Sequence, residues 1–275
     1  MMRTVKFYLI YAVMAIATMG TFNGCESGTG IGDLNLYSPS DDAQMGAQLD
    51  AEIRKLPNEY PIYNNAAATQ YLQDIMNEIL ISDEIKYREV FTYNVTIIES
   101  ETINAFATPG GYVYFYTGML KFLENEAMLA SIMAHEIAHA ELRHATKRMT
   151  KQMGLSVLLS VILGNNPAQL TEIAANLFAG LEFLRNSRED EAESDEYSFK
   201  YLLSTKWYPG AGKMFFELVA KGGTTGAIEE LLSTHPPDEK RIAAIEAMIK
   251  EYNIAPPTEA NLFTQRYQQF KQTLN

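Results

Sequence analysis

The chain has 275 residues, of which 47% are hydrophobic, so it is long enough for one substantial core and is expected to form a single domain. Its net charge of -12 argues against a nucleic-acid-binding protein, because an acidic surface does not release counterions from a phosphate backbone. The sequence shows no repeat of fixed period and no low-complexity tract.

The first 24 residues have the pattern of a secretory signal. Two basic residues precede an uncharged, apolar stretch over residues 7–22, which is too short to be a comfortable transmembrane helix. Gly24 then precedes Cys25, the only cysteine of the chain, and this arrangement resembles a bacterial lipoprotein signal. We expect residues 1–24 to be removed and Cys25 to carry a lipid that anchors the protein to a membrane. The alternative is an incidental cysteine in an ordinary signal segment.

Residues 25–40 begin with a stretch rich in Gly and Ser and are expected to be a flexible tether, so that the domain covers residues 41–275. Two amphipathic helices are expected next. The first is capped at Ser40-Asp41-Asp42, runs to about Leu56 and has Met45, Leu49, Ile53 and Leu56 on one apolar face, and the second covers residues 66–81. Both helices are expected to contribute packing and no chemistry.

Two strands are predicted by β-branched and aromatic residues at 92–98 and 112–117, with a strong turn signal at Pro109-Gly110-Gly111 between them. We expect a small antiparallel sheet packed beside the helix that follows. An exposed edge of this sheet could hold an extended peptide by backbone hydrogen bonds. A purely structural hairpin explains the same pattern equally well.

Residues 125–153 contain no Gly or Pro and predict one helix, with Asn125 as its N-cap. The helix carries His135-Glu-Ile-Ala-His139. Side chains four residues apart share a face, about 5–6 Å apart at Cβ, so both imidazoles can reach one ion at the ~2.0–2.1 Å of a zinc-to-nitrogen bond. Glu136 is rotated about 100° off that face, where it can act as a general base toward a water on the metal.

A chance pairing of the two histidines is disfavoured by their distribution. The chain has four histidines, and three of them fall together at His135, His139 and His144. The fourth, His235, opens a Pro-rich turn. We therefore predict a zinc site on this helix.

Residues 155–163 carry no charge and are too few to span a bilayer. They are expected to form a core hairpin, with a flap or membrane-touching segment over the cleft as the alternative. A further helix is expected over residues 168–184.

The run from Ser187 to Asp195 is dense in carboxylates and lies on a predicted helix. A charge run of this kind usually forms a solvated helix face, but catalytic zinc commonly takes three protein ligands plus water, and the two-histidine motif supplies only two. Glu191 and Asp195 are four residues apart, so one could bind the metal and the other could orient a ligand histidine. Spacing alone does not rank Glu189, Glu191 and Glu193.

The C-terminal third is expected to be helical, over residues 211–220 and from an N-cap at Asp238 to about Glu251. Arg241 lies in the first turn of the second helix, where a positive charge is unfavourable against the helix dipole and hints at a specific partner. Residues 256–275 are expected to be a short polar helix or a loose tail.

Four motifs then align, in order, with one known family. They are Asn104-Ala-Phe-Ala-Thr-Pro-Gly-Gly111, His135-Glu-x-x-His139, Ser187-Arg-x-x-Glu191-x-Glu193-x-Asp195, and Thr234-His-Pro-Pro-x-x-x-Arg241-Ile242. From about Ser40 to Ile249 the chain resembles the HtpX-type and CAAX-prenyl-protease-type zinc metallopeptidases, metallopeptidase family forty-eight, of gluzincin type. The resemblance implies an α+β, mostly helical, zincin-like domain with the small antiparallel sheet beside the HExxH helix.

The resemblance also implies the metal ligands. One zinc ion (Zn2+) per chain would be held by His135, His139 and Glu191, with Glu136 as the catalytic base. Asp195 would support a ligand histidine, and Glu193 would lie outside the ligand set.

Roles around the cleft follow from the same resemblance. His235 and Arg241 would lie over the cleft as catalytic residues, with His235 either stabilising the oxyanion together with Arg241 or closing on the zinc as a fourth ligand in a latent state. Asn104, Ala105 and Phe106 would bind substrate as part of an edge hairpin. Ser194 and Ser198 stand where the family usually has Ala and Gly. Both residues are small, so these departures affect helix packing and leave the metal ligands intact.

The implied function is a zinc metalloendopeptidase that hydrolyses unfolded or misassembled envelope proteins, a role in protein quality control. It would act as a periplasmic lipoprotein anchored to a bacterial membrane, with the outer membrane favoured, and would bind no nucleic acid. The first alternative is a latent zinc-containing chaperone or assembly factor for outer-membrane proteins. The second is a structural lipoprotein scaffold, which would contain no zinc.

Overall fold

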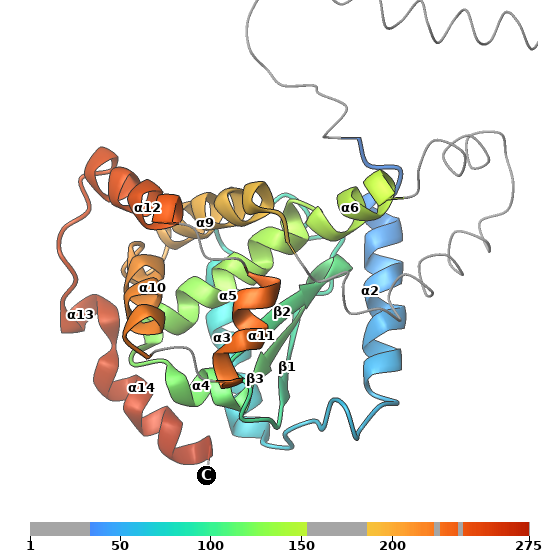
Figure 1. Cartoon of the computed structure of the whole chain (residues 1–275), viewed down its shortest axis with the longest axis horizontal. Coiled ribbons are helices and arrows are strands. Elements are labelled where there is room, and N and C mark those ends of the chain that lie inside the picture. Colours follow the sequence, from blue (N-terminus) through green and yellow to red (C-terminus); the bar gives the residue numbers. More distant parts are fainter. Residues whose placement is uncertain (1–33, 153–185, 223–225, 236–238, 275) are drawn as a thin grey trace, which may run out of the picture. The chain divides into compact units, whose positions relative to one another are not determined.

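The computed structural model describes residues 34–152, 186–222, 226–235 and 239–274 (Figure 1). Several expectations fall outside the described residues: the signal segment 1–24, Cys25, the first part of the tether, the apolar segment 155–163, the helix over 168–184 and the N-cap Asp238.

The elements follow in chain order. They are α2 (Pro39–Ile53), α3 (Ala66–Ile79), β1 (Asn94–Ile98), β2 (Ala105–Thr108), the 3-10 turn η2 (Pro109–Gly111), β3 (Tyr112–Tyr116), α4 (Thr117–Phe122), α5 (Glu126–Glu141), α6 (His144–Gln152), α9 (Arg188–Leu202), α10 (Ala211–Gly222), α11 (Gly226–Thr234), α12 (Glu239–Glu251), α13 (Glu259–Leu262), α14 (Thr264–Lys271) and η4 (Gln272–Leu274). The mostly helical α+β class is confirmed.

The three strands form one mixed sheet in the order β1-β3-β2. β2 and β3 are antiparallel, whereas β1 and β3 are parallel, with Val95 opposite Val113. The expected small sheet beside the HExxH helix is therefore confirmed, but its purely antiparallel pairing is wrong. The reason is that β3 returns between β1 and β2 and runs in the direction of β1. Residues 105–108, expected as a connection, form the edge strand β2.

The turn between β2 and β3 lies directly on α2, and glycines make this approach possible. Gly110 and Gly111 have φ of 75° and 86°, in the left-handed region that glycine adopts without strain. A Cβ on Gly110 would lie 2.8 Å from Ala43 Cα, and a Cβ on Gly46 would lie 2.0 Å from Pro109 O. α2 and this turn therefore fix each other's position.

The N-cap of α2 lies two residues before the expected Ser40. Ser38 is the N-cap: its hydroxyl accepts a hydrogen bond from the Asp41 N–H, and the Asp41 carboxylate accepts one from the Ser38 N–H. Met45 is buried as expected, but the helix ends at Ile53 and leaves Leu56 43% exposed. The expected apolar face is therefore wrong at its C-terminal end.

The single helix expected over residues 125–153 is divided into α5 and α6. Arg143, between them, has φ of 59°. Its Nε lies 2.6 Å from Asp42 Oδ2, its Nη2 lies 3.1 Å from Asp42 Oδ1, and Nη2 also donates to the Tyr37 carbonyl. A left-handed residue costs roughly 1–3 kcal/mol when it is not glycine, so the ion pair with α2 overrides a sequence of good helix formers.

α5 forms the centre of the core. All residues of Glu126–Glu141 are buried, and the helix contacts α3, α9, α10 and β2 (Figure 1). Asn125 is the N-cap, as expected, and its side chain accepts from the Met128 N–H. A helix buried on every side cannot pivot easily, so the residues that it carries are held in fixed positions.

The chain end is helical and packed, so a loose tail over residues 256–275 is excluded within the part that the structure describes. Tyr267 is fully buried and donates to the Leu120 carbonyl at 2.7 Å. Phe270 stacks on Tyr71 with ring centroids 4.1 Å apart. α14 thereby covers the region where α5 begins.

The described residues from Leu34 onward belong to one compact unit. Among the helices of this described part, none combines the length and apolar character needed to cross a membrane.

Candidate metal centre

Two imidazoles face each other on α5. The Nε2 atoms of His135 and His139 lie 3.0 Å apart, and the ring centroids lie 4.6 Å apart. The four-residue spacing on one helix puts both rings on the same face. Both histidines are less than a tenth exposed, so the surrounding core sets the orientation of their rings.

Glu191 completes this group from α9. A capping box at Ser187 starts α9, and Glu191 follows in its first turn with a fully buried side chain. Its Oε1 lies 3.3 Å from His139 Nε2, and its Oε2 lies 3.4 Å from His135 Nε2. Of the carboxylates that spacing left unranked, Glu191 is the one that the structure brings to the two histidines.

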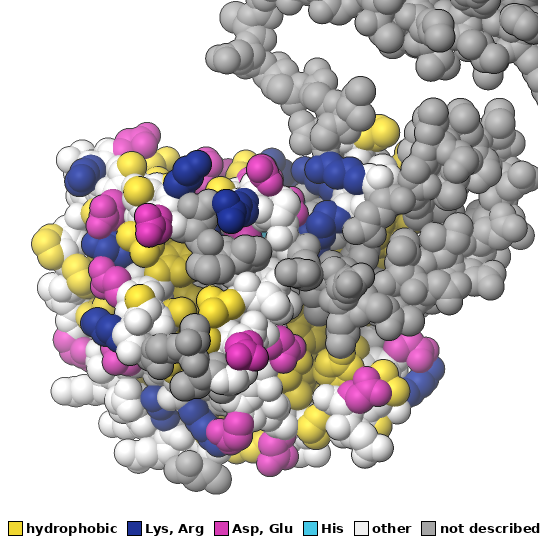
Figure 2. Space-filling view, viewed as in Figure 1, with side chains coloured by type: hydrophobic (Ala, Val, Ile, Leu, Met, Phe, Trp, Pro, Cys, Tyr) yellow, Lys and Arg dark blue, Asp and Glu magenta, His cyan; other side chains and the backbone are white. Residues whose placement is uncertain are grey.

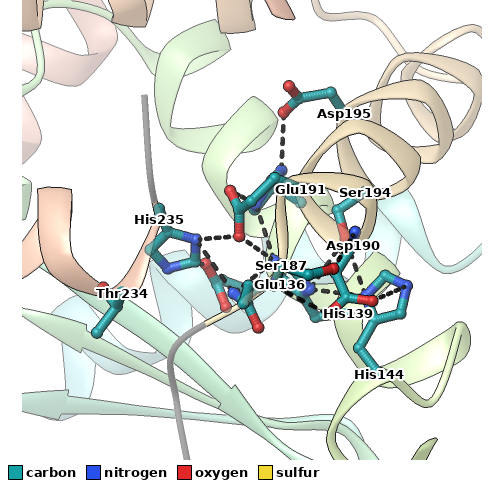
Figure 3. A network of polar contacts seen from close by, with 12 residues as sticks. Glu136, His139, His144, Ser187, Asp190, Glu191, Ser194, Asp195, Thr234 and His235 are labelled. Atoms are coloured by element: carbon teal, nitrogen blue, oxygen red, sulfur yellow. Dashed lines mark hydrogen bonds and ion pairs between the residues drawn. The ribbon is translucent and has the colours of Figure 1, made fainter. Parts of the chain in front are cut away.

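His235, at the end of α11, also reaches this group. Its Nδ1 lies 3.0 Å from Glu191 Oε1, and its Nε2 lies 3.6 Å from Glu136 Oε1 (Figure 3). One ligand atom from each of His135, His139, Glu191 and His235 lies within 4.8 Å of the others.

The donor set fits a zinc ion. Two Nε2 atoms at 3.0 Å cannot bond to each other unless a proton or cation lies between them. Glu191 Oε2 is buried and makes no hydrogen bond of good geometry, although Arg241 Nη1 lies 2.7 Å away. Two imidazoles and a carboxylate are a ligand set of catalytic zinc sites, in which one position stays open.

Glu136 lies beside this group and is 2% exposed. Burial raises the pKa of its carboxyl group, while the nearby His235 and a hydrogen bond from the Ala107 backbone act in the opposite direction. The Ala107 contact also ties Glu136 to the edge strand β2. A carboxyl group with a raised pKa can hold a proton between two steps of a reaction.

Asp195 and Arg241 form the outer support of His135. Asp195 Oδ1 lies 3.0 Å from His135 Nδ1, the ring nitrogen that faces away from Glu191. Arg241 donates to both Asp195 oxygens, at 2.6 Å and 2.8 Å, and its Nη1 reaches Glu191. The position of Arg241 in the first turn of α12 suggested a specific partner, and the structure shows that it pairs with Asp195 and Glu191.

His144 and Ser194 form the outer support of His139. His139 Nδ1 lies 2.8 Å from His144 Nδ1 and 3.0 Å from Ser194 Oγ (Figure 3). His144 Nε2 in turn lies 3.0 Å from Glu193 Oε2. Glu193 therefore lies outside the ligand group, at the end of a chain of contacts that leads to His139.

This second support depends on the break between α5 and α6. On a continuous helix, residues five apart point about 140° away from each other, so His139 and His144 would not meet. The left-handed Arg143 turns the chain, and His144 then opens α6 with its ring against His139. The Asp42–Arg143 ion pair is thus connected to the candidate metal centre.

The expected substrate-binding residues lie at the start of β2. Asn104 is 1% exposed, and its side chain contacts Glu230 at 3.4 Å. Ala105 and Phe106 begin the edge strand, and Phe106 stacks on Tyr114 with centroids 4.6 Å apart.

Sequence reasoning missed the roles of four residues. The sequence groups His144 with two other histidines and marks Ser194 as a departure from the family pattern, but it does not show that both contact His139. Their residue types were a signal, because a histidine or a hydroxyl that is buried beside the metal-binding helix needs a polar partner. Arg143 and Asn186, whose Nδ2 lies 3.2 Å from His139 Nε2, gave no such signal.

Comparison with known proteins places this geometry in context. A family model described as Peptidase family M48 matches residues 66–249, which is more than half of the chain.

Individual relatives agree with that match. The beta-barrel assembly-enhancing protease of Escherichia coli (strain K12) is 28% identical over 265 residues, which cover 88% of this chain and 52% of the relative. The mitochondrial metalloendopeptidase OMA1 of Schizosaccharomyces pombe is 28% identical over 204 residues, which cover 73% of this chain and 57% of the relative. The chain therefore spans about half the length of the curated relatives that it matches.

Proposed function

The chain belongs to peptidase family M48, and from this premise we propose that it is a zinc-dependent endopeptidase. The observation that carries the proposal is the convergence of His135, His139 and Glu191 beside the buried carboxyl group of Glu136. The names of the relatives, a metalloendopeptidase and a protease, support the same activity.

His135 and His139 would hold one zinc ion through Nε2, and Glu191 would hold it through its carboxylate. When bound, zinc supplies Lewis-acid chemistry, which lowers the pKa of a coordinated water from 15.7 to about 7. Asp195 and His144 orient the two imidazoles from behind, through their Nδ1 atoms.

Glu136 moves the proton. Its carboxylate takes a proton from the attacking water as the peptide carbonyl is attacked, and then gives it to the leaving amine. Glu136 lies beside β2, since Ala107 and Glu136 line the same hollow. A substrate strand along the edge of β2 would therefore present its carbonyl group next to Glu136.

His235 would donate a hydrogen bond to the oxyanion, a contribution of roughly 2.7–4 kcal/mol for a single donor of this kind. Arg241 acts through Asp195 and Glu191, since its guanidinium pairs with both carboxylates. We assign it a positioning role.

The substrates that we propose are unfolded or misassembled proteins of the bacterial envelope. The support is the name of the relatives that are called beta-barrel assembly-enhancing proteases. The lipid on Cys25 would hold the enzyme at a membrane on the periplasmic side. Labelling of the expressed protein with a fatty acid should depend on Cys25, and labelling of Cys25→Ser would refute the anchor.

The test of the activity is cleavage of unfolded casein by the zinc-loaded protein. Glu136→Gln should retain zinc and the folded state, because it is nearly isosteric, but should lose hydrolysis. Retained cleavage by Glu136→Gln would refute the assignment of the base.

A second candidate function, a latent zinc-containing chaperone or assembly factor, is favoured by one observation. His235 Nδ1 lies within the same group of ligand atoms as the other three residues, so it could close the open zinc position. His235→Ala separates the two functions. It should raise proteolysis if His235 closes the site, and abolish it if His235 stabilises the oxyanion.

A further inference from the structure

An apolar hollow lies on one side of Glu136, among α5, α10, α11 and α12. It encloses about 720 Å³ of space, part of which is open to solvent. Most of its wall is aliphatic or aromatic, including Met119, Ile132, Phe215, Phe216, Val219 and Leu231. Figure 2 shows hydrophobic side chains on the face of the molecule where Figure 1 places α10 and α11. Because the apolar hollow is partly open, a side chain of a bound segment can enter it from outside.

Three polar groups in the wall of the apolar hollow, those of Asp195, Ser198 and Arg241, already have partners. Ser198 Oγ donates to the Ser131 carbonyl at 3.0 Å. Asp195 and Arg241 neutralise each other, and Phe216 lies under the Arg241 guanidinium, with its centroid 4.6 Å away. A charged side chain entering this hollow would lose its hydration without gaining a dedicated partner, which is unfavourable.

A second, polar hollow of about 440 Å³ lies on the other side of Glu136. Its wall includes Arg143, His144, Arg148 and Asp42. Glu136 and His235 line both hollows. The two proposed catalytic side chains therefore lie at the boundary between an apolar and a polar space.

The edge strand β2 crosses that boundary. Ala105, at its start, lines the apolar hollow, and the residues after it, 106–108, line the polar hollow. A peptide strand along β2 would pass from one hollow to the other at Glu136. Because successive side chains of a strand alternate between faces, a residue next to the reacting carbonyl can point into the apolar hollow.

We propose that the apolar hollow is the specificity pocket of the enzyme and receives a bulky apolar side chain, such as Phe, Leu or Met, that flanks the scissile bond. This inference rests on the proposed peptidase function. It defines the substrate class by side-chain chemistry, so that uncharged, poorly folded segments that expose apolar residues are preferred over charged ones.

The test uses internally quenched peptides that differ at one position beside the scissile bond, with Phe, Leu, Ala, Lys or Asp there. The zinc-loaded full chain should cleave the Phe and Leu peptides with a kcat/KM at least about 10-fold above that of the Ala peptide, as expected for a hydrophobic pocket. The Lys and Asp peptides should be the poorest substrates.

Val219→Trp fills the hollow from α10, and Ala220→Trp is the matched control on the exposed side of the same helix. Val219→Trp should reduce the ratio of kcat/KM between the Phe and Ala peptides at least about 5-fold, and Ala220→Trp should leave this ratio unchanged. Thermal melting and zinc content establish that both variants are folded.

Binding gives a second readout that does not need turnover. Glu136→Gln should bind the Phe peptide more tightly than the Lys peptide, and addition of Val219→Trp should remove the difference. Equal cleavage of all peptides, or a Phe preference that survives Val219→Trp, would overturn the pocket while leaving the peptidase assignment intact. Absence of any cleavage by the zinc-loaded protein would instead contradict the proposed function itself.

Discussion

The two histidines of the candidate centre are supported in different ways on the sides that face away from Glu191. His135 Nδ1 meets a carboxylate, Asp195, at 3.0 Å, and the Arg241 guanidinium balances that charge. His139 Nδ1 meets no carboxylate among the described residues, and its partners there are the His144 ring and the Ser194 hydroxyl. We call the first the ionic support. We call the second the neutral support, because no carboxylate touches His139 there and Glu193 is reached only through the His144 ring.

The difference is visible in the pKa of each ring. Burial alone would lower the pKa of His135, but its hydrogen bonds to Asp195 and Glu191 outweigh burial and raise it to about 10. For His139, burial dominates and holds the pKa well below the usual range. A carboxylate partner makes an imidazole a stronger donor toward a metal, and a neutral partner does not.

The neutral support fixes a tautomer. If His139 presents its Nε2 lone pair to the metal, its proton lies on Nδ1, and His144 Nδ1, at 2.8 Å, is the nearer of its two possible acceptors. The His144 proton then lies on Nε2, where it is donated to Glu193 Oε2 at 3.0 Å. Glu193, with 44% of its side chain exposed, therefore contributes to the orientation of the buried His139 through the His144 ring.

Asp195→Asn tests the ionic support and should have the largest effect on zinc affinity. Loss of the carboxylate should raise the zinc dissociation constant by about 100-fold, the upper end for partners of ligand histidines. A competition titration with a chelator measures it, and Glu196→Gln, a change on the exposed face of the same helix, is the control. An unchanged dissociation constant in Asp195→Asn would show that the ionic support is dispensable.

His144→Phe tests the neutral support and should have a smaller effect, about 10-fold in the same titration. Phe keeps the ring volume but offers no acceptor to His139 Nδ1, which retains Ser194 Oγ. His144→Asn keeps an acceptor near the Nδ1 position and should recover most of the affinity. Equal losses in both variants would indicate that His144 contributes volume alone.

Asp42→Asn tests whether the helix break delivers His144. Removal of one member of a buried ion pair should destabilise the fold by about 3 kcal/mol, which urea unfolding would measure. Zinc should bind more weakly than in the wild type, but less so than in His144→Phe, because the effect is indirect. Asp74→Asn, an exposed change on α3, is the control. If Asp42→Asn lowers the free energy of unfolding but leaves the zinc dissociation constant unchanged, the break between α5 and α6 does not support the metal centre.

Ser194→Ala should have the smallest effect, less than about 3-fold in zinc affinity, because His144 remains as the acceptor. Combined with His144→Phe, it should lower affinity by more than the product of the single effects, since His139 Nδ1 then has neither partner. If the loss of zinc affinity in the double variant equals the product of the two single losses, His144 and Ser194 do not share the hydrogen bond from His139 Nδ1.

The ionic support was largely foreseeable from the sequence, and the neutral support was not. His135, His139, Glu191 and Asp195 lie on two regular helices, where spacing of four residues decides which side chains share a face. Their partnership then needs only that the two helices pack together. The family pattern supplied the choice of Glu191 among the neighbouring carboxylates.

His144 became a partner of His139 only because Arg143 interrupts the helix, and the cause of that interruption lies 101 residues away at Asp42. A local sequence of good helix formers carries no trace of such a contact. The same reason explains the parallel pairing of β1 and the packed tail at Tyr267, which both depend on distant neighbours.

Structure determination of the zinc-loaded Glu136→Gln protein, with anomalous scattering at the zinc edge, tests the central assignment most directly. The account predicts one zinc ion per chain, bound by Nε2 of His135 and His139 at about 2.0–2.1 Å and by a Glu191 oxygen at about 2.0–2.2 Å. Zinc held elsewhere, or a Glu191 carboxylate that stays on Arg241 and does not bind the ion, would contradict it.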